Sequence, residues 1–193
     1  MEFVFTPTPQ AGVYWAFTLL WLAEFVLFRS RPAGEQPARR WGTQRIALCI
    51  SLSFASTGAF YHFEIGNLHG QAAGWIRSSG LVFYGGGILL RNWAAWSLGS
   101  WFSRRVQAEA GQDLVSRGPY RCLRHPLYLG LLLAALGMNL LMANAPGFLL
   151  AVTGVVRAIH GRMQEEEDVL EAGLGPRYAR WKESRYRLLP FIY

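Results

Sequence analysis

Five long apolar stretches divide the 193-residue chain and constrain its fold more than any other feature. They cover residues 11–28, 46–61, 74–98, 127–142 and 146–159. Apolar runs of this kind form buried or membrane-spanning helices, and a spanning helix needs roughly 20 residues. We therefore expect an all-α polytopic membrane protein with about five transmembrane helices. The last two stretches are short, which predicts a C-terminal helical hairpin with its turn at Asn144-Ala145-Pro146.

The distribution of charge predicts how such a protein is oriented. Only 16% of the residues are charged, against about 25% in a soluble domain. The net charge is +7, and the basic residues cluster after the first, third and fifth stretches, whereas only Arg77 lies near the loop between the second and third. The positive-inside rule then places the N-terminus outside and the C-terminus in the cytoplasm. The same charge suits membrane lipids as partners and argues against nucleic acid.

Several single features carry less information. The two cysteines, Cys49 and Cys122, lie in or beside apolar runs without metal-ligand spacing, so we expect neither a disulfide nor a metal site. Three consecutive glycines at 85–87 lack the strand–turn–helix context of a nucleotide loop, which favours close helix packing instead. Arg91 lies inside the third apolar stretch, where either a functional role or snorkelling to the inner interface explains it.

Two polar clusters in the second half of the chain have the residue types that chemistry requires. The first, residues 117–130, places turn-forming, basic and aromatic residues directly before the fourth stretch, with Pro126 suited to a first helical turn. The second, residues 162–168, reads Arg-Met-Gln-Glu-Glu-Glu-Asp directly after the fifth stretch. Taken separately, the clusters are compatible with headgroup anchors and with a solvated helix face on which Arg162 and Glu166 form a weak ion pair.

Taken together, the clusters predict a binding site. The hairpin returns both to the same face, so a carboxylate, the His-Pro turn and several tyrosines should meet there. A sulfonium cation is attracted to tyrosine rings and to carboxylates. We therefore divide the chain into N-terminal transmembrane helices, residues 1–98, and a core that carries the site, residues 99–193, within one structural domain.

The motifs of this core resemble a known family. They comprise Gly118, Tyr120, Arg124, His125, Pro126, Tyr128 and Gly130, then Arg162, Glu166, Glu167, Leu170, Leu174-Gly175, Tyr178 and Leu189-Pro190-Phe191, with Gly99-Ser100-Trp101-Phe102 and Val106-Gln107 upstream. Over residues 91–193 the pattern resembles the isoprenylcysteine carboxyl methyltransferase and phospholipid methyltransferase family of integral membrane enzymes. Two positions depart from the family pattern, since Gln112 stands for a frequent histidine and Trp181 for a frequent tyrosine.

The resemblance implies a methyltransferase that uses S-adenosylmethionine. It implies cofactor contacts from Gln107, Gln112, Asp113, Leu114, Val115, Tyr120, His125, Pro126, Leu127, Tyr128 and Glu166. Arg162 and Glu166 would be the catalytic residues, Arg162 holding the acceptor. The acceptor would be hydrophobic or lipid-linked, and an isoprenylcysteine carboxylate, a phospholipid amine, a lipidic phenol and a thiol all remain open. An NADPH-dependent membrane reductase of the steroid-reductase type and a non-enzymatic membrane protein are the alternatives.

Overall fold

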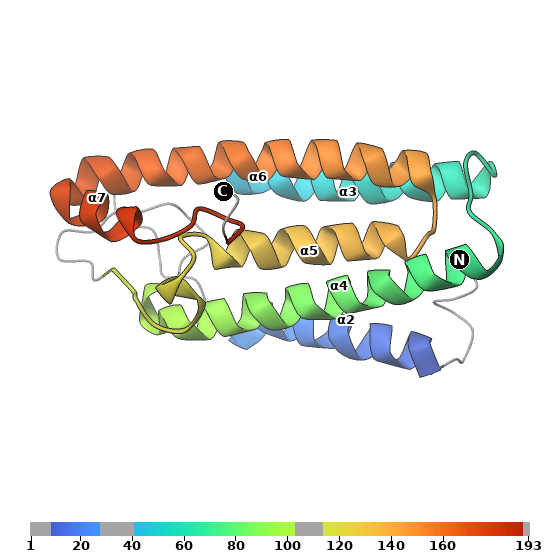
Figure 1. Ribbon diagram of the computed structural model, residues 1–193, viewed down its shortest axis with the longest axis horizontal. Helices are drawn as coiled ribbons and strands as arrows, with labels where there is room; N and C mark the ends of the chain where they lie inside the picture. The colour runs from blue at the N-terminus through green and yellow to red at the C-terminus, as the bar shows by residue number, and fades with distance from the viewer. Residues whose placement is uncertain (1–8, 28–40, 103–113, 191–193) are drawn as a thin grey trace.

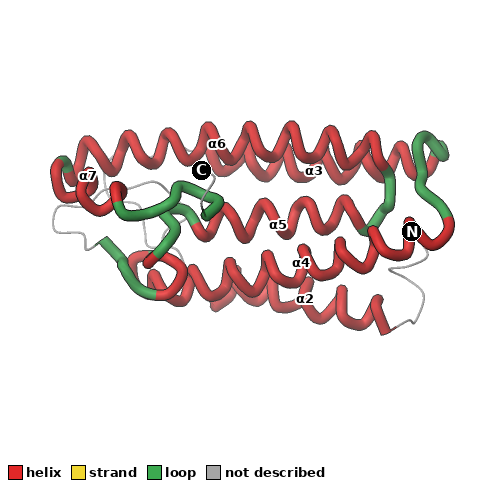
Figure 2. The backbone as a smooth tube through the Cα atoms, viewed as in Figure 1, coloured by secondary structure: helices red, strands yellow, loops and turns green. Residues whose placement is uncertain are grey.

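The computed structural model describes residues 9–27, 41–102 and 114–190, and over these residues the chain is helical (Figure 2). The helices are α2 (Pro9–Leu27), α3 (Trp41–His62), α4 (Gly70–Leu98), α5 (Pro126–Leu140), α6 (Ala145–Leu174) and α7 (Pro176–Glu183). Two 3-10 turns, η1 (Gly99–Trp101) and η2 (Gly118–Arg121), lie between α4 and α5. The described ranges contain no strand, so the predicted all-α class is confirmed.

Each of the five predicted apolar stretches coincides with a helix, and the largest difference in bounds concerns α6. We expect the fifth stretch to end near Ile159, but α6 continues through the acidic cluster to Leu174 and is 30 residues long. Glutamate and glutamine are good helix formers, so nothing in that cluster stops the helix. It ends at Gly175, which has a φ of 51°, and Pro176 follows. Glycine with positive φ followed by proline is a common helix stop.

The structure also tests whether these helices have the character of membrane spans. Among the described residues, no helix is both long enough and apolar enough to cross a membrane. The five helices are therefore present where we expect them, whereas their number as transmembrane segments is not confirmed.

The long helices run roughly along one direction (Figure 1). α6 lies beside α3, α5 lies in the middle, and α4 packs on α5 with α2 on its other side. The short link between α5 and α6 is fixed by Asn144, whose side chain accepts a hydrogen bond from the Gly147 N–H at 2.9 Å. The Asn144 amide also donates to the Ile65 carbonyl and to Asn67 Oδ1, at 2.8 Å each. These bonds tie the link to the loop between α3 and α4.

Glycines allow α4 and α5 to approach backbone to backbone. A Cβ atom added at Gly87 would lie 2.4 Å from the Ala134 nitrogen and 2.6 Å from the Gly130 carbonyl oxygen. One added at Gly85 would lie 2.5 Å from the Phe17 ring of α2. Gly86 by contrast has nothing within 4 Å of such a Cβ. The predicted role of the glycine run in close helix packing is therefore confirmed for its two outer members.

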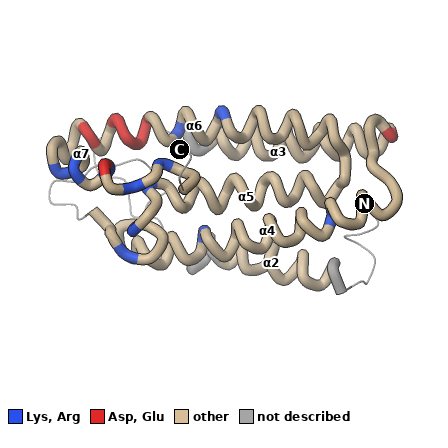
Figure 3. Tube along the Cα trace, viewed as in Figure 1, with Lys and Arg blue, Asp and Glu red and all other residues tan. Residues whose placement is uncertain are grey.

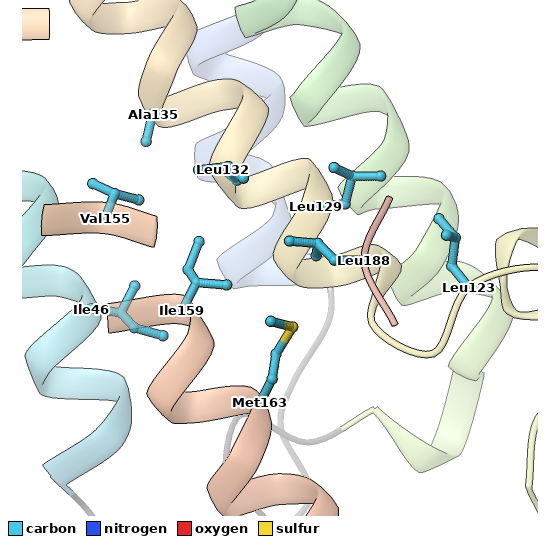
Figure 4. Close-up of a cluster of buried hydrophobic side chains, with 9 residues drawn as sticks. All are labelled: Ile46, Leu123, Leu129, Leu132, Ala135, Val155, Ile159, Met163 and Leu188. Atoms are coloured by element: carbon cyan, nitrogen blue, oxygen red, sulfur yellow. The ribbon is translucent and has the colours of Figure 1, made fainter. Parts of the chain in front are cut away.

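The main apolar core lies between α3, α5 and α6 (Figure 4). Most of its side chains come from these three helices. Leu123 comes from the segment before α5, and Leu188 comes from the segment after α7. The cluster consists of Ile46, Leu123, Leu129, Leu132, Ala135, Val155, Ile159, Met163 and Leu188. Because Leu123 and Leu188 belong to it, the core extends to the end of the bundle where the His-Pro turn lies.

Two alanine substitutions test the glycine contact. We expect Gly87→Ala to destabilise the protein by about 1–3 kcal/mol, because the added methyl group meets backbone atoms that cannot rotate away. Gly86→Ala is the matched control and should be neutral or stabilise by up to about 1 kcal/mol, through better helix propensity alone. The thermal unfolding midpoint of the purified protein measures both. Equal midpoints for the two variants would contradict the close packing.

Candidate functional site

Charged residues gather at the end of the bundle that carries α7 (Figure 3). Arginines from η2 and the segment after it lie there with the acidic residues of α6. The two polar clusters of the sequence, which lie on opposite sides of the α5–α6 link, meet at this end through side-chain hydrogen bonds.

Tyr128 links the two residues to which the sequence assigns a catalytic role. The Tyr128 hydroxyl donates to Glu166 Oε2 at 2.7 Å, and it accepts from Arg162 Nε at 3.2 Å. Arg162 is buried, with 4% of its surface exposed, so the alternative of a solvated ion pair is wrong for it. Its guanidinium also lies 3.7 Å from Glu165 Oε2. Arg162 and Glu166 thus both hydrogen-bond to the Tyr128 hydroxyl, whereas Arg162 forms an ion pair with Glu165.

Glu167, to which the sequence analysis assigns no role, holds the His-Pro turn. Its Oε1 accepts from His125 Nε2 at 3.0 Å and lies 3.5 Å from Arg124 Nη1, and its Oε2 lies 3.2 Å from Arg187 Nη2. Burial raises the pKa of the Glu167 carboxyl, but the hydrogen bond from His125 and the charges of His125, Arg187 and Arg124 outweigh it. The net effect is a pKa below the usual value of 4.5.

The segment after α7 pairs with the backbone of the His-Pro turn. The Arg124 N–H donates to the Tyr186 carbonyl at 2.8 Å, and the His125 N–H donates to the Arg187 carbonyl at 3.2 Å. The Tyr186 N–H in turn donates to the Cys122 carbonyl at 2.9 Å. His125 is the N-cap of α5 and Pro126 occupies its first turn, as the sequence predicts. The sequence analysis does not predict this strand-like pairing, because the paired segments are distant in sequence.

The remaining predicted cofactor residues are only partly within the described chain. Leu114 and Val115 lie half-buried in the segment before η2, and Tyr120 lies buried within η2. Leu127 follows Pro126 in the first turn of α5. Gln107, Gln112 and Asp113 lie outside the described residues.

Tyr120 and Arg91 come close to the Glu166 group. Burial raises the pKa of Tyr120 well above its usual value, and the negative charge of Glu166 raises it further. The positive charge of Arg91 acts in the opposite direction. Arg91 Nη1 also donates to the Leu127 carbonyl at 3.4 Å. This contact favours a role for Arg91 at the start of α5 over snorkelling to an interface.

The donor set suits a cationic, polar and aromatic ligand. Glu166 offers a carboxylate beside two tyrosine rings, and such groups attract a sulfonium or an ammonium. The Tyr178 hydroxyl is buried, and no hydrogen-bond partner for it is found in the described part of the chain. A buried polar atom of this kind is normally satisfied by water or a ligand. Among the described residues, no three His, Cys, Asp or Glu side chains are arranged to hold a metal ion.

Comparisons with known proteins agree on the class of protein. A solved structure described as the eukaryotic intramembrane Ras methyltransferase ICMT superposes with a TM-score of 0.66, at 20% identity, over 97% of this chain and 69% of that chain. The helical bundle is therefore of the same fold. Residues 81–172 match the model of the isoprenylcysteine carboxyl methyltransferase (ICMT) family. This match covers just under half of the chain, and it agrees with the family resemblance of the sequence motifs.

Curated relatives match over a similar region. The protein-S-isoprenylcysteine O-methyltransferase of Mus musculus is 34% identical over 121 residues, which is 61% of this chain and 42% of that protein. Protein-S-isoprenylcysteine O-methyltransferase A of Arabidopsis thaliana is 28% identical over 120 residues, 61% of each chain. The matches thus cover less than two thirds of the length of these relatives.

The position of Glu167 predicts an acid-sensitive contribution to stability. Since its pKa is lower in the folded protein, the stabilisation is complete above the usual value of 4.5 and is lost as the pH falls through the lowered pKa. We expect Glu167→Gln to cost about 1.5–3 kcal/mol at neutral pH, the range for hydrogen bonds to charged groups. The difference from wild type should shrink below pH 4.5.

Glu171→Gln is the control for this experiment. Glu171 lies one helical turn further along α6, is 46% exposed and pairs with Lys182. An exposed pair of this kind contributes little, so the variant should change stability by no more than about 0.5 kcal/mol. Unfolding midpoints measured between pH 3 and pH 8 compare the two. A pH-independent loss in Glu167→Gln would contradict the ionic role of Glu167.

Proposed function

We propose that this protein is an S-adenosylmethionine-dependent methyltransferase that acts on a lipidic or small hydrophobic acceptor. The observation that carries the proposal is the chain of contacts from Arg162 through Tyr128 to Glu166. It joins both motif clusters at one end of the bundle. All three residues lie within the segment that matches the family model. The matched relatives are named methyltransferases, so the comparisons give the reductase alternative no support.

The cofactor would lie against Glu166, Tyr128, Tyr120, the His125–Leu127 turn and the Leu114–Val115 segment. Gln107, Gln112 and Asp113 complete the proposed contact set. S-adenosylmethionine supplies an activated methyl group on a cationic sulfur. The protein's contribution is then mainly to fix the approach of the acceptor and to exclude water. The carboxylate of Glu166 and the tyrosine rings stabilise positive charge at this place.

Arg162 would hold the acceptor. It is buried and its Nε is engaged by the Tyr128 hydroxyl, so its orientation is fixed relative to Glu166. A guanidinium binds a carboxylate through paired hydrogen bonds. A carboxylate acceptor also needs no general base. Because the matched relatives are named protein-S-isoprenylcysteine O-methyltransferases, an isoprenylcysteine-like carboxylate is the first acceptor to test.

We further propose that the bundle lies in a membrane, with the N-terminus outside and the site on the cytoplasmic side. Large apolar side chains face outward on four helices, as is typical of a lipid-facing surface. They include Leu19, Leu22, Leu48, Leu52, Trp75, Val82, Phe83, Leu89, Trp93, Trp96, Leu149 and Leu150. Arginines gather at the end of the bundle that carries α7 (Figure 3), whereas Arg77 lies in the early part of α4, which supports the orientation. Labelling of a Ser184→Cys variant by an impermeant reagent from outside would contradict it.

Cofactor binding gives the direct test of this function. We expect purified protein to bind S-adenosylmethionine and to transfer its labelled methyl group to a component of a lipid extract. Glu166→Ala should weaken cofactor binding by about 1–3 kcal/mol, because a charge-assisted hydrogen bond is lost. Glu171→Ala, on the same helix, should bind as the wild type does. Calorimetry measures both, and unchanged affinity in a folded Glu166→Ala protein would remove Glu166 from the site.

Arg162→Lys separates acceptor binding from cofactor binding. Lysine keeps the charge but cannot donate the paired hydrogen bonds of a planar guanidinium. Turnover should therefore fall about tenfold or more, roughly 1.4 kcal/mol of transition-state stabilisation. Cofactor affinity should change little. Turnover is measured with the identified acceptor at saturating cofactor, and Arg162→Ala should be slower still. Near-wild-type turnover in Arg162→Ala would end the acceptor role of Arg162.

A further inference from the structure

Arg185, in the segment that follows α7, contacts parts of the chain that are far apart in sequence. Its Nε donates to the Tyr120 carbonyl at 2.7 Å, and its Nη1 donates to the Trp181 carbonyl at 2.6 Å. Its Nη2 donates to Ser116 Oγ at 3.0 Å. The guanidinium also lies over the Trp181 ring, 4.5 Å from its centre. One side chain therefore joins α7, η2 and the segment that precedes η2.

Ser116 is the point at which this network reaches the backbone before η2. Its hydroxyl accepts from Arg185 Nη2 and from Trp181 Nε1, the latter at 3.1 Å. A hydroxyl has two acceptor positions and one hydrogen to donate. Its hydrogen is directed to the Leu114 carbonyl at 3.3 Å. Since all three positions are used, the conformation of residues 114–116 is coupled to the position of Arg185.

Neither the proposed chemistry of the site nor the packing of the apolar core accounts for this arrangement. Arg185 is half-buried and has no ion pair with a carboxylate in the described part of the chain, so its charge is not neutralised locally. Its three side-chain nitrogens donate to two backbone carbonyls and to the hydroxyls of Ser116 and Ser184. Both backbone segments that it holds, Tyr120 and Leu114–Ser116, belong to or adjoin the proposed cofactor contacts.

We propose that Arg185 is a positioning residue for the cofactor. It holds the Leu114–Ser116 segment and Tyr120 at a fixed spacing from α7, and so keeps one wall of the site in its binding conformation before the cofactor arrives. The proposal rests on the proposed function and adds a residue to it. Ordering this wall in advance lowers the entropy lost on binding, which improves affinity without any contact to the cofactor.

The substitution Arg185→Lys tests the proposal. A lysine ammonium retains the charge but cannot reach the Tyr120 carbonyl, the Trp181 carbonyl and the Ser116 hydroxyl at once. We expect S-adenosylmethionine affinity, measured by calorimetry, to fall about tenfold, because the wall must then be ordered on binding. At saturating cofactor, kcat should stay close to the wild-type value while KM for the cofactor rises.

Arg180→Lys is the matched control. Arg180 lies on α7, is exposed, and its Nε reaches the Pro176 carbonyl of its own helix at 3.4 Å. The Arg180→Lys substitution should leave both the affinity and the KM for S-adenosylmethionine unchanged. The double variant with Ser116→Ala adds a further check. If Arg185 acts through Ser116, the loss of affinity in the double variant should be smaller than the sum of the two single losses.

A measurement without cofactor separates this inference from the proposed function. A nitroxide is attached to Val115→Cys in a protein whose Cys49 and Cys122 are replaced by serine. We expect its mobility by electron paramagnetic resonance to increase with Arg185→Lys and not with Arg180→Lys. Unchanged mobility, or unchanged affinity in Arg185→Lys while the wild type binds the cofactor, overturns the inference alone. A wild-type protein that binds no S-adenosylmethionine overturns the proposed function, and the cofactor role of Arg185 with it.

Discussion

Two adjacent carboxylates on α6 hold the start of α5, and the geometry of the site depends on them. Glu166 accepts from the Tyr128 hydroxyl, and Glu167 accepts from the His125 ring. Because the two acids are neighbours on one helix, their contacts with His125 and Tyr128 fix the start of α5 relative to α6. They require α6 to continue as a helix well past its apolar half, which it does as far as Leu174.

Holding charges in a partly buried place is costly unless each has partners. Glu167 therefore pairs with Arg124 and Arg187 as well as His125. Through Arg187, this contact fixes the segment after α7 against α6. The backbone of that segment then satisfies the N–H groups of Arg124 and His125, which lie before the helical ladder of α5 begins. The end of the chain is thus part of the site's framework, and Leu188 connects it to the apolar core.

The parts of this structure that local rules govern could be predicted from the sequence. Apolar stretches located five helices, and the glycines at 85 and 87 correctly indicated close packing. The apolar pattern does not predict the end of α6, because the apolar stretch stops near Ile159 whereas the acidic residues that follow still favour helix. The motif residues of the site, Glu167 among them, come from a family resemblance. The contacts of Glu167, Arg185 and Arg187 join segments that are distant in sequence. No spacing rule reveals such contacts before the fold is known.

The bundle and the site place different demands on the sequence. The α4–α5 contact demands small residues at particular positions, since any side chain at Gly87 meets backbone atoms. Most other buried positions of the bundle demand only apolar volume, which many sequences supply. This explains why the fold is shared with a structure at 20% identity, while the family match concentrates in residues 81–172. That segment contains the carboxylates, the His-Pro turn and the α4–α5 glycines, whose contacts each depend on particular residue types. The segment after α7 lies outside the residues that match the family model, and it contacts Tyr120 and Ser116 through Arg185.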